Sequence, residues 1–165
     1  YDWSYVYRIG LVAYLKIQQQ QDDTLIDTDW GLILPIYRAA LHAREEGAWQ
    51  LEQALLARLD RSVQAAGSKL MVVALPEIFQ AEDAAWAKVE SADEALVRDA
   101  PQQRLVEIMP PDAAYLDLLP DLQAVAQTTD YYYDGDGHFN PAGHHFTAQA
   151  IADYLTAQGW VDCGS

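Results

Sequence analysis

The sequence has a single cysteine, Cys163, so no disulfide can form within the chain. It also has no apolar run long enough to cross a membrane, and no basic segment followed by an apolar one, as a signal peptide would show. These absences exclude a disulfide-stapled scaffold and a helical membrane span within these residues.

Basic residues are scarce. The chain contains 10 lysines and arginines against 25 aspartates and glutamates, which gives a formal net charge of −15. Such a chain repels phosphates, so nucleic acids and anionic membrane surfaces are excluded as partners. A solvated acidic surface is the simplest interpretation of the charge.

The length of 165 residues, with 51% hydrophobic content, suits one domain with its own core and is too short for two. Residues 1–46 are expected to form an N-terminal helical region, with helices from Asp2 to Gln20 and from about Pro35 to Glu46. We expect the apolar stripe of the first helix to pack against the core. The alternative is an exposed stripe that binds a partner, which would make the chain a protein-interaction domain.

Residues 48–160 indicate an α/β fold. A helical stripe from Ala48 to Ala66 ends at Gly67 in the usual cap position. The run from Leu70 to Leu75 is apolar on both faces, as in a parallel strand covered by helices, and Ala114 to Leu118 is a second candidate strand. Glu77 follows the first strand, where ligands bind in open sheets, although a solvated loop acid is the simpler interpretation. Further helices are expected at Ala81 to Val97, Pro101 to Met109 and Pro120 to Thr128.

The stretch from Asp130 to His145 carries the most distinctive chemistry. Two carboxylates and an imidazole, Asp134, Asp136 and His138, lie within five residues on what we expect to be a glycine-flanked loop. Asn140 can cap the helix that follows. A loop held against a rigid helix is a suitable mount for a general base.

The pattern Asp-x-His-Phe-Asn-Pro-x-Gly-His, followed by an amphipathic helix, resembles the last sequence block of the SGNH/GDSL family of serine esterases and lipases. The resemblance covers roughly residues 48–160. It implies a flavodoxin-like three-layer α/β/α fold and a Ser-His-Asp triad that acts on O-acyl esters of small molecules or glycans, without a metal or organic cofactor. His138 would then be the base. Asp136 would be the orienting acid of an acetyltransferase-like Asp-x-His variant, with Asp134 as the fallback, because the commoner Asp-x-x-His spacing falls on a glycine.

The nucleophile block of that family, Gly-Asp-Ser, does not occur here, nor do its oxyanion-hole glycine and its Gly-x-Asn-Asp block. The serines stand in other contexts, at positions 4, 62, 68, 91 and 165. We therefore expect this chain to be the C-terminal part of a longer enzyme, and to be inactive when isolated.

The tyrosines at 131 to 133 offer apolar rings for an acyl or sugar group, although packing under the loop explains them equally well. We take Tyr133 and Asn140 as candidate substrate-binding residues.

A calcium-binding or carbohydrate-binding module is an alternative function for the same loop. Asp134 and Asp136 match part of an EF-hand-type loop, but its two anchoring carboxylate positions fall on Tyr132 and Gly143. A zinc site is not indicated, because no cysteine or third histidine stands at suitable spacing from the adjacent His144 and His145.

Only two strands are expected, and an apolar strand normally has neighbours on both edges. We therefore expect the uncovered edge of the first strand to be shielded by the N-terminal segment, by a rearrangement or by a second copy of the chain, which would make a homo-oligomer.

Overall fold

The computed structural model describes residues 34–92, 95–133 and 136–161, with the backbone alone at Ala92 and Asp136. Residue contacts divide the chain into residues 1–36 and residues 37–165, and the second unit is described below. The helix expected from Asp2 to Gln20, Ser4 and Cys163 lie outside the described residues. The described elements are η1 (Leu34–Tyr37), α3 (Ala43–Ala65), β1 (Met71–Ala74), α4 (Ile78–Ala81), α5 (Asp83–Ala92), α6 (Ala100–Ile108), β2 (Ala114–Asp117), α7 (Leu119–Val125), β3 (Tyr132–Tyr133), β4 (Asp136–Phe139) and α8 (Pro141–Ala157).

Strands β1 and β2 form a parallel pair, in register from Met71 opposite Ala114 to Ala74 opposite Asp117. Both strands occur where the apolar runs predict them, so the α/β class is confirmed. In the described part of the chain this pair and the antiparallel pair β3–β4 are the two sheets. A parallel strand is reached only through a crossover, and here α4, α5 and α6 make that crossover.

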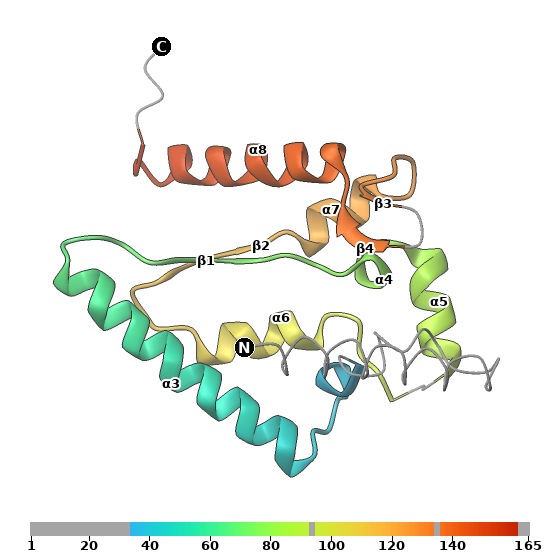
Figure 1. Ribbon diagram of the computed structural model, residues 1–165, viewed down its shortest axis with the longest axis horizontal. Helices are drawn as coiled ribbons and strands as arrows, with labels where there is room; N and C mark the ends of the chain where they lie inside the picture. The colour runs from blue at the N-terminus through green and yellow to red at the C-terminus, as the bar shows by residue number, and fades with distance from the viewer. Residues whose placement is uncertain (1–33, 93–94, 134–135, 162–165) are drawn as a thin grey trace, which may run out of the picture. The chain divides into compact units, whose positions relative to one another are not determined.

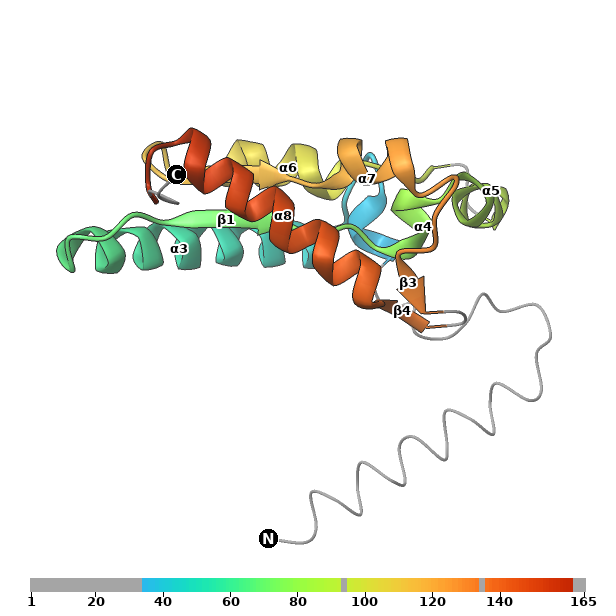
Figure 2. The same ribbon diagram turned by 90° about the horizontal axis from the view of Figure 1, so that it is seen from above.

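Helices cover both faces of the parallel pair, with α8 on one face and α3 and α6 on the other (Figures 1 and 2). Helix α8 runs the length of β1. Near its start, Tyr132 of the hairpin donates a hydrogen bond to the Pro76 carbonyl at the end of β1, at 2.8 Å. Beyond its end, the ring of Trp160 lies 4.9 Å from the Lys69 ammonium that precedes β1. The hairpin and the segment after α8 are therefore tied to the two ends of β1.

Helix α3 ends as its sequence predicts: Gly67 has a φ of 71°, a left-handed conformation that glycine adopts without strain. Its leucines are divided between two environments. Leu56 is buried at 7% exposure, whereas Leu51, Leu55 and Leu59 are 61%, 50% and 48% exposed. The apolar stripe of this helix is therefore wider than the surface that the described chain packs against it.

The most deeply buried side chains lie around α4, α5 and α7. Phe79, Val89, Leu118 and Leu122 are fully buried. Tyr37 packs edge-on against Phe79, with ring centroids 5.1 Å apart. This part of the core lies at the carboxyl ends of β1 and β2, next to the segment that carries the candidate site.

Three local predictions were wrong. The helix expected from Pro35 to Glu46 is a 3-10 turn, an extended segment and then the start of α3 at Ala43. The expected helix from Ala81 to Val97 gives way to non-helical backbone at residues 95–97. Both changes have one cause, because Arg38 and Leu96 form a β-bridge, flanked by the hydrogen bonds Val97 N to Tyr37 O and Ala39 N to Ala95 O at 2.8 and 3.3 Å.

The third wrong prediction is the expected loop around His138. Its described residues form the antiparallel hairpin of β3 and β4. Residues that the glycine content assigns to a loop are drawn into strands by their pairing with one another.

Candidate active site

The candidate site lies at the carboxyl edge of the parallel pair. Strand β1 continues into Pro76 and Glu77, and β2 ends at Asp117 in the same direction. The hairpin joins this edge through the Tyr132 hydroxyl on the Pro76 carbonyl. Buried Tyr132 also packs on the ring of Phe139, 4.8 Å between centroids. A backbone carbonyl two residues beyond β1 and an aromatic pair thus position the hairpin beside the end of the strand.

His138 lies on β4 with an exposed side chain, two residues before the cap of α8. Asp136 begins the same strand, opposite Tyr133. The side chain of Asp136 and the whole of Asp134 lie outside the described residues. The predicted hydrogen bond between one of these carboxylates and the His138 ring therefore stays a prediction.

Asn140 performs the capping role that its position predicts. Its Oδ1 accepts hydrogen bonds from the Ala142 and Gly143 backbone at 2.8 and 3.0 Å. Its Nδ2 donates to the carbonyls of Asp130 and Tyr132 at 2.7 and 3.1 Å. One amide therefore fastens the start of α8 to the first residue of β3 and to the segment before it, and its substrate-binding role stays a prediction.

Tyr133, the other candidate substrate-binding residue, is 51% exposed on β3. It is next to Tyr132, whose ring points the other way into the core, because successive side chains alternate along a strand. Tyr133 is thus an exposed aromatic side chain on the same hairpin as His138.

Glu77 is the residue that sequence reasoning undervalued. It is half-buried, so the interpretation as a solvated loop acid is wrong. Burial raises the pKa of its carboxyl above the usual value, while the charge of His138 pulls that pKa down. A Cβ atom added to Gly137, the neighbour of His138, would lie 3.5 Å from Glu77 Oε2. The position of Glu77 at the carboxyl end of a buried strand was the available signal.

Asp117, at the end of β2, accepts a hydrogen bond from the Leu119 backbone at 2.9 Å and so helps to start α7. Burial raises its pKa. Burial and the nearby Asp117 carboxylate raise the pKa of Tyr115 to about 12. Both side chains lie on β2, with Asp117 at its carboxyl end. Among the described residues, neither is observed in contact with His138.

Of the three serines in the described ranges, Ser68 precedes the amino end of β1, whereas the candidate site lies at the carboxyl end, and the other two donate within their own helices. Ser62 Oγ donates to the Arg58 carbonyl at 3.0 Å and Ser91 Oγ to the Lys88 carbonyl at 2.8 Å, each within its own helix. Each hydroxyl hydrogen is thus engaged with a carbonyl one turn earlier.

No group of three histidine, cysteine, aspartate or glutamate side chains gathers at metal-binding distance in the described ranges. The two aspartates of the proposed calcium loop fall outside that description. Across the same ranges, no helix combines the length and the apolar character that a membrane crossing requires.

Comparison with known proteins identifies the family. No curated protein and no solved structure was found to match the chain. One family does match, over residues 37–163, and its description is "SGNH hydrolase-like domain, acetyltransferase AlgX". This is a family of the acyl-esterase or acetyltransferase type, and the match spans β1, β2, the hairpin and α8. The chain therefore belongs to the SGNH hydrolase-like domain family of the acetyltransferase AlgX.

Proposed function

We propose that the chain supplies the base of a serine acyl-transfer site, with His138 as the general base and Asp136, or failing it Asp134, as the acid that orients the ring. The serine nucleophile comes from sequence outside these 165 residues. The substrate is an O-acyl ester of a small molecule or glycan. Acetyl is the acyl group that we favour, because the family description names an acetyltransferase.

The observation that carries the proposal is the position of His138. It is exposed, on a strand, at the carboxyl edge of a parallel sheet, where ligands of open α/β folds bind. Asp136 is favoured as its partner because it stands two residues before His138 on the same strand, whereas Asp134 is four residues away. A base mounted on a paired strand is held more firmly than one on a free loop.

The chemistry of the step follows from these roles. The serine oxygen bonds to the acyl carbon as its proton passes to a ring nitrogen of His138. The carboxylate holds the other ring nitrogen and stabilises the imidazolium. The proton then leaves on the departing alcohol, and water or an acceptor hydroxyl releases the acyl group in the reverse sequence.

The experiment compares two histidine variants in a longer protein that contains this chain together with its nucleophile block. His138→Ala should lower acyl transfer from p-nitrophenyl acetate by at least about a thousandfold, the scale of a lost triad base. His145→Ala is the matched control: its side chain is also exposed, seven residues further on α8, and the variant should keep the wild-type rate. Full activity of the His138 variant would contradict the proposal.

The isolated 165-residue chain should show no turnover of the same ester above buffer. Hydrolysis that a serine-directed reagent blocks would mean that the chain contains its own nucleophile, and Ser4 would be the first residue to test.

A further inference from the structure

Glu77 is fixed by a reciprocal capping arrangement at the start of α4. Its side chain accepts a hydrogen bond from the Gln80 backbone N–H, while Gln80 Oε1 accepts one from the Glu77 N–H at 3.2 Å. The capping arrangement limits the directions that the carboxylate can take.

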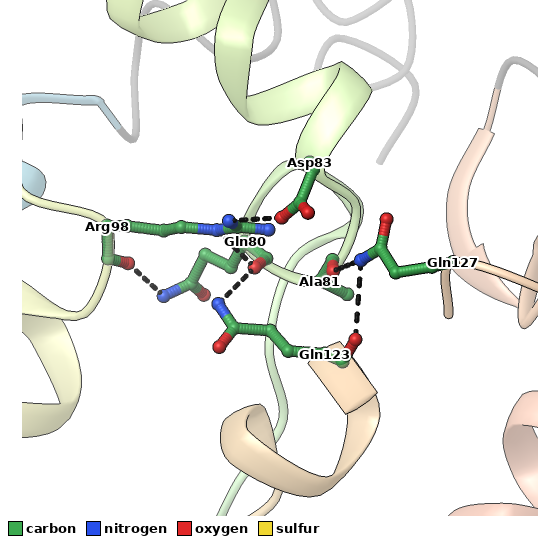
Figure 3. Close-up of polar contacts among 6 residues, drawn as sticks. All are labelled: Gln80, Ala81, Asp83, Arg98, Gln123 and Gln127. Atoms are coloured by element: carbon green, nitrogen blue, oxygen red, sulfur yellow. Dashed lines mark hydrogen bonds and ion pairs between the residues drawn. The ribbon is translucent and has the colours of Figure 1, made fainter. Parts of the chain in front are cut away.

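Helix α4 has four residues, too few to be stable by itself. A polar network holds it in place (Figure 3). Gln80 is 2% exposed, and its Nε2 donates to the Arg98 carbonyl at 2.7 Å and to Gln102 Oε1 at 2.9 Å. Its own carbonyl accepts from Arg98 Nε at 2.6 Å and from Gln123 Nε2 at 2.9 Å.

The same network reaches the elements around α4. Arg98 also pairs with Asp83 at 2.7 Å, and Gln127 of the segment after α7 donates to the Ala81 carbonyl at 3.1 Å. Side chains from α5, α7, the turn before α6 and the segment after α7 therefore converge around α4 (Figure 3), and Gln102 adds one from α6. Because satisfied buried polar networks rigidify the backbone they contact, the Glu77 end of α4 is held in one position.

The hairpin brings His138 to this carboxylate. Tyr132 is bonded to Pro76, the residue before Glu77. Gly137 has no side chain to separate strand β4 from Glu77 Oε2, which would touch a Cβ there at 3.5 Å. The charges of Glu77 and His138 interact. The Tyr132–Pro76 hydrogen bond and the closeness of Glu77 Oε2 to Gly137 thus bring the carboxylate to the strand residue next to His138.

Among the described residues, the ionisable groups besides His138 that interact with Glu77 are two tyrosines, which do not neutralise it. Burial and the Glu77 carboxylate raise the pKa values of the Tyr37 and Tyr132 hydroxyls, and the charge of Glu82 raises that of Tyr132 further. Both hydroxyls are therefore uncharged at neutral pH. An interaction between two titrating groups is mutual, so an ionised Glu77 favours the protonated form of His138 as much as protonated His138 favours ionised Glu77.

We infer that Glu77 is a positioning residue of the site, a second carboxylate beside Asp136 that holds the His138 strand segment and stabilises the imidazolium formed during acyl transfer. The inference rests on the proposed function for the role of His138 as a base. The contact that it requires lies within this chain and can be measured without activity.

The test is an NMR titration of the histidine ring signals in the 165-residue chain, with His138 assigned by the signal that disappears in His138→Ala. Glu77→Gln removes the charge but keeps an acceptor for the cap. It should lower the titration midpoint of His138 by about half a unit to one unit, the lower range for loss of a nearby opposite charge. The midpoints of His144 and His145 should not move.

Glu82→Gln is the matched control. Glu82 is also half-buried with a pKa raised by burial, but the charges acting on it are those of Asp130 and Lys88. This variant should leave the His138 midpoint within about 0.2 units. Glu77→Asp keeps the charge and the capping ability, so its His138 midpoint should lie closer to the wild-type value than that of Glu77→Gln. If Glu77→Gln fails to fold, the His138 midpoint of Glu77→Asp should still lie near the wild-type value.

An unchanged His138 midpoint in folded Glu77→Gln, or a Glu77→Asp variant that behaves like Glu77→Gln, would overturn the inference. Activity separates it from the proposed function. If His138→Ala loses activity but Glu77→Gln leaves the His138 midpoint unchanged, the proposed function stands and only the role inferred for Glu77 is contradicted. In the active longer protein, Glu77→Gln should lower kcat and shift the acidic limb of the pH–rate profile to lower pH, with KM unchanged.

Discussion

Gly143 is the position where a single methyl group should disturb the site from a distance. It is the third residue of α8, buried against the hairpin. A Cβ atom added here would collide with the Tyr131 carbonyl oxygen and would lie 2.6 and 2.9 Å from Cδ1 and Cβ of Phe139. None of these atoms is the free end of a flexible side chain, so Gly143→Ala must move β3 and β4 away from α8.

The expected cost is set by two opposing effects. Overpacking of this kind costs about 1 to 3 kcal/mol. Replacing glycine by alanine in a helix returns up to about 1 kcal/mol. Because a backbone oxygen and a ring must both move, we expect the upper part of that cost, about 2 to 3 kcal/mol, and a net loss of about 1 to 2 kcal/mol. This loss should lower Tm by roughly 2 to 8 °C in a domain of this size.

Gly47→Ala is the control for this variant. Gly47 is also near the start of a helix, α3, but nothing lies within 4 Å of a Cβ there. It should gain up to about 1 kcal/mol, so the two glycine-to-alanine changes should have opposite signs in thermal or urea unfolding. A Gly143→Ala variant as stable as the wild type, with unshifted His138 NMR signals, would refute the packing of the hairpin against α8.

Two further predictions concern the surfaces of the α/β part. Leu56→Ala should cost about 2 to 4 kcal/mol in urea unfolding, whereas Leu55→Ala should cost under about 1 kcal/mol, because Leu56 is buried and its neighbour is half in solvent; equal losses would contradict this division of α3. Since no described strand pairs with the outer edge of β1 or of β2, light scattering should detect a concentration-dependent oligomer. A monomer at every concentration would require that edge to be shielded within one chain.

Local sequence patterns were sufficient to predict the features that depend on residues adjacent in the chain. The run from Leu70 to Leu75 predicts a parallel strand because it is apolar on both faces, and β1 confirms it. Asn140 and Pro141 predict the start of α8 because capping depends on adjacent residues alone, and the cap is observed. The Asp-x-His pattern predicted the SGNH family, which the family match over residues 37–163 confirms.

Backbone pairing between distant segments determined the structure where the local sequence pattern predicted it wrongly. The segment around Arg38 bonds to the segment around Leu96, nearly sixty residues away, and this pairing replaces the helices that local propensity favours at both places. Strand β4 likewise depends on pairing with β3, because Asp136 and Gly137, two of its four residues, are weak strand formers alone.

The sequence by itself determined the family, the α/β class and His138 as the candidate base, because each depends on residues that are neighbours along the chain. The burial of Glu77 and its charge interaction with His138 were decided by the tertiary structure. Glu77 lies 61 residues before His138, and its burial and charge interaction exist only because the Gln80 network fixes α4 and the Tyr132 hydroxyl attaches the hairpin to Pro76. Electrostatic coupling depends on distance in space, which residue order does not contain.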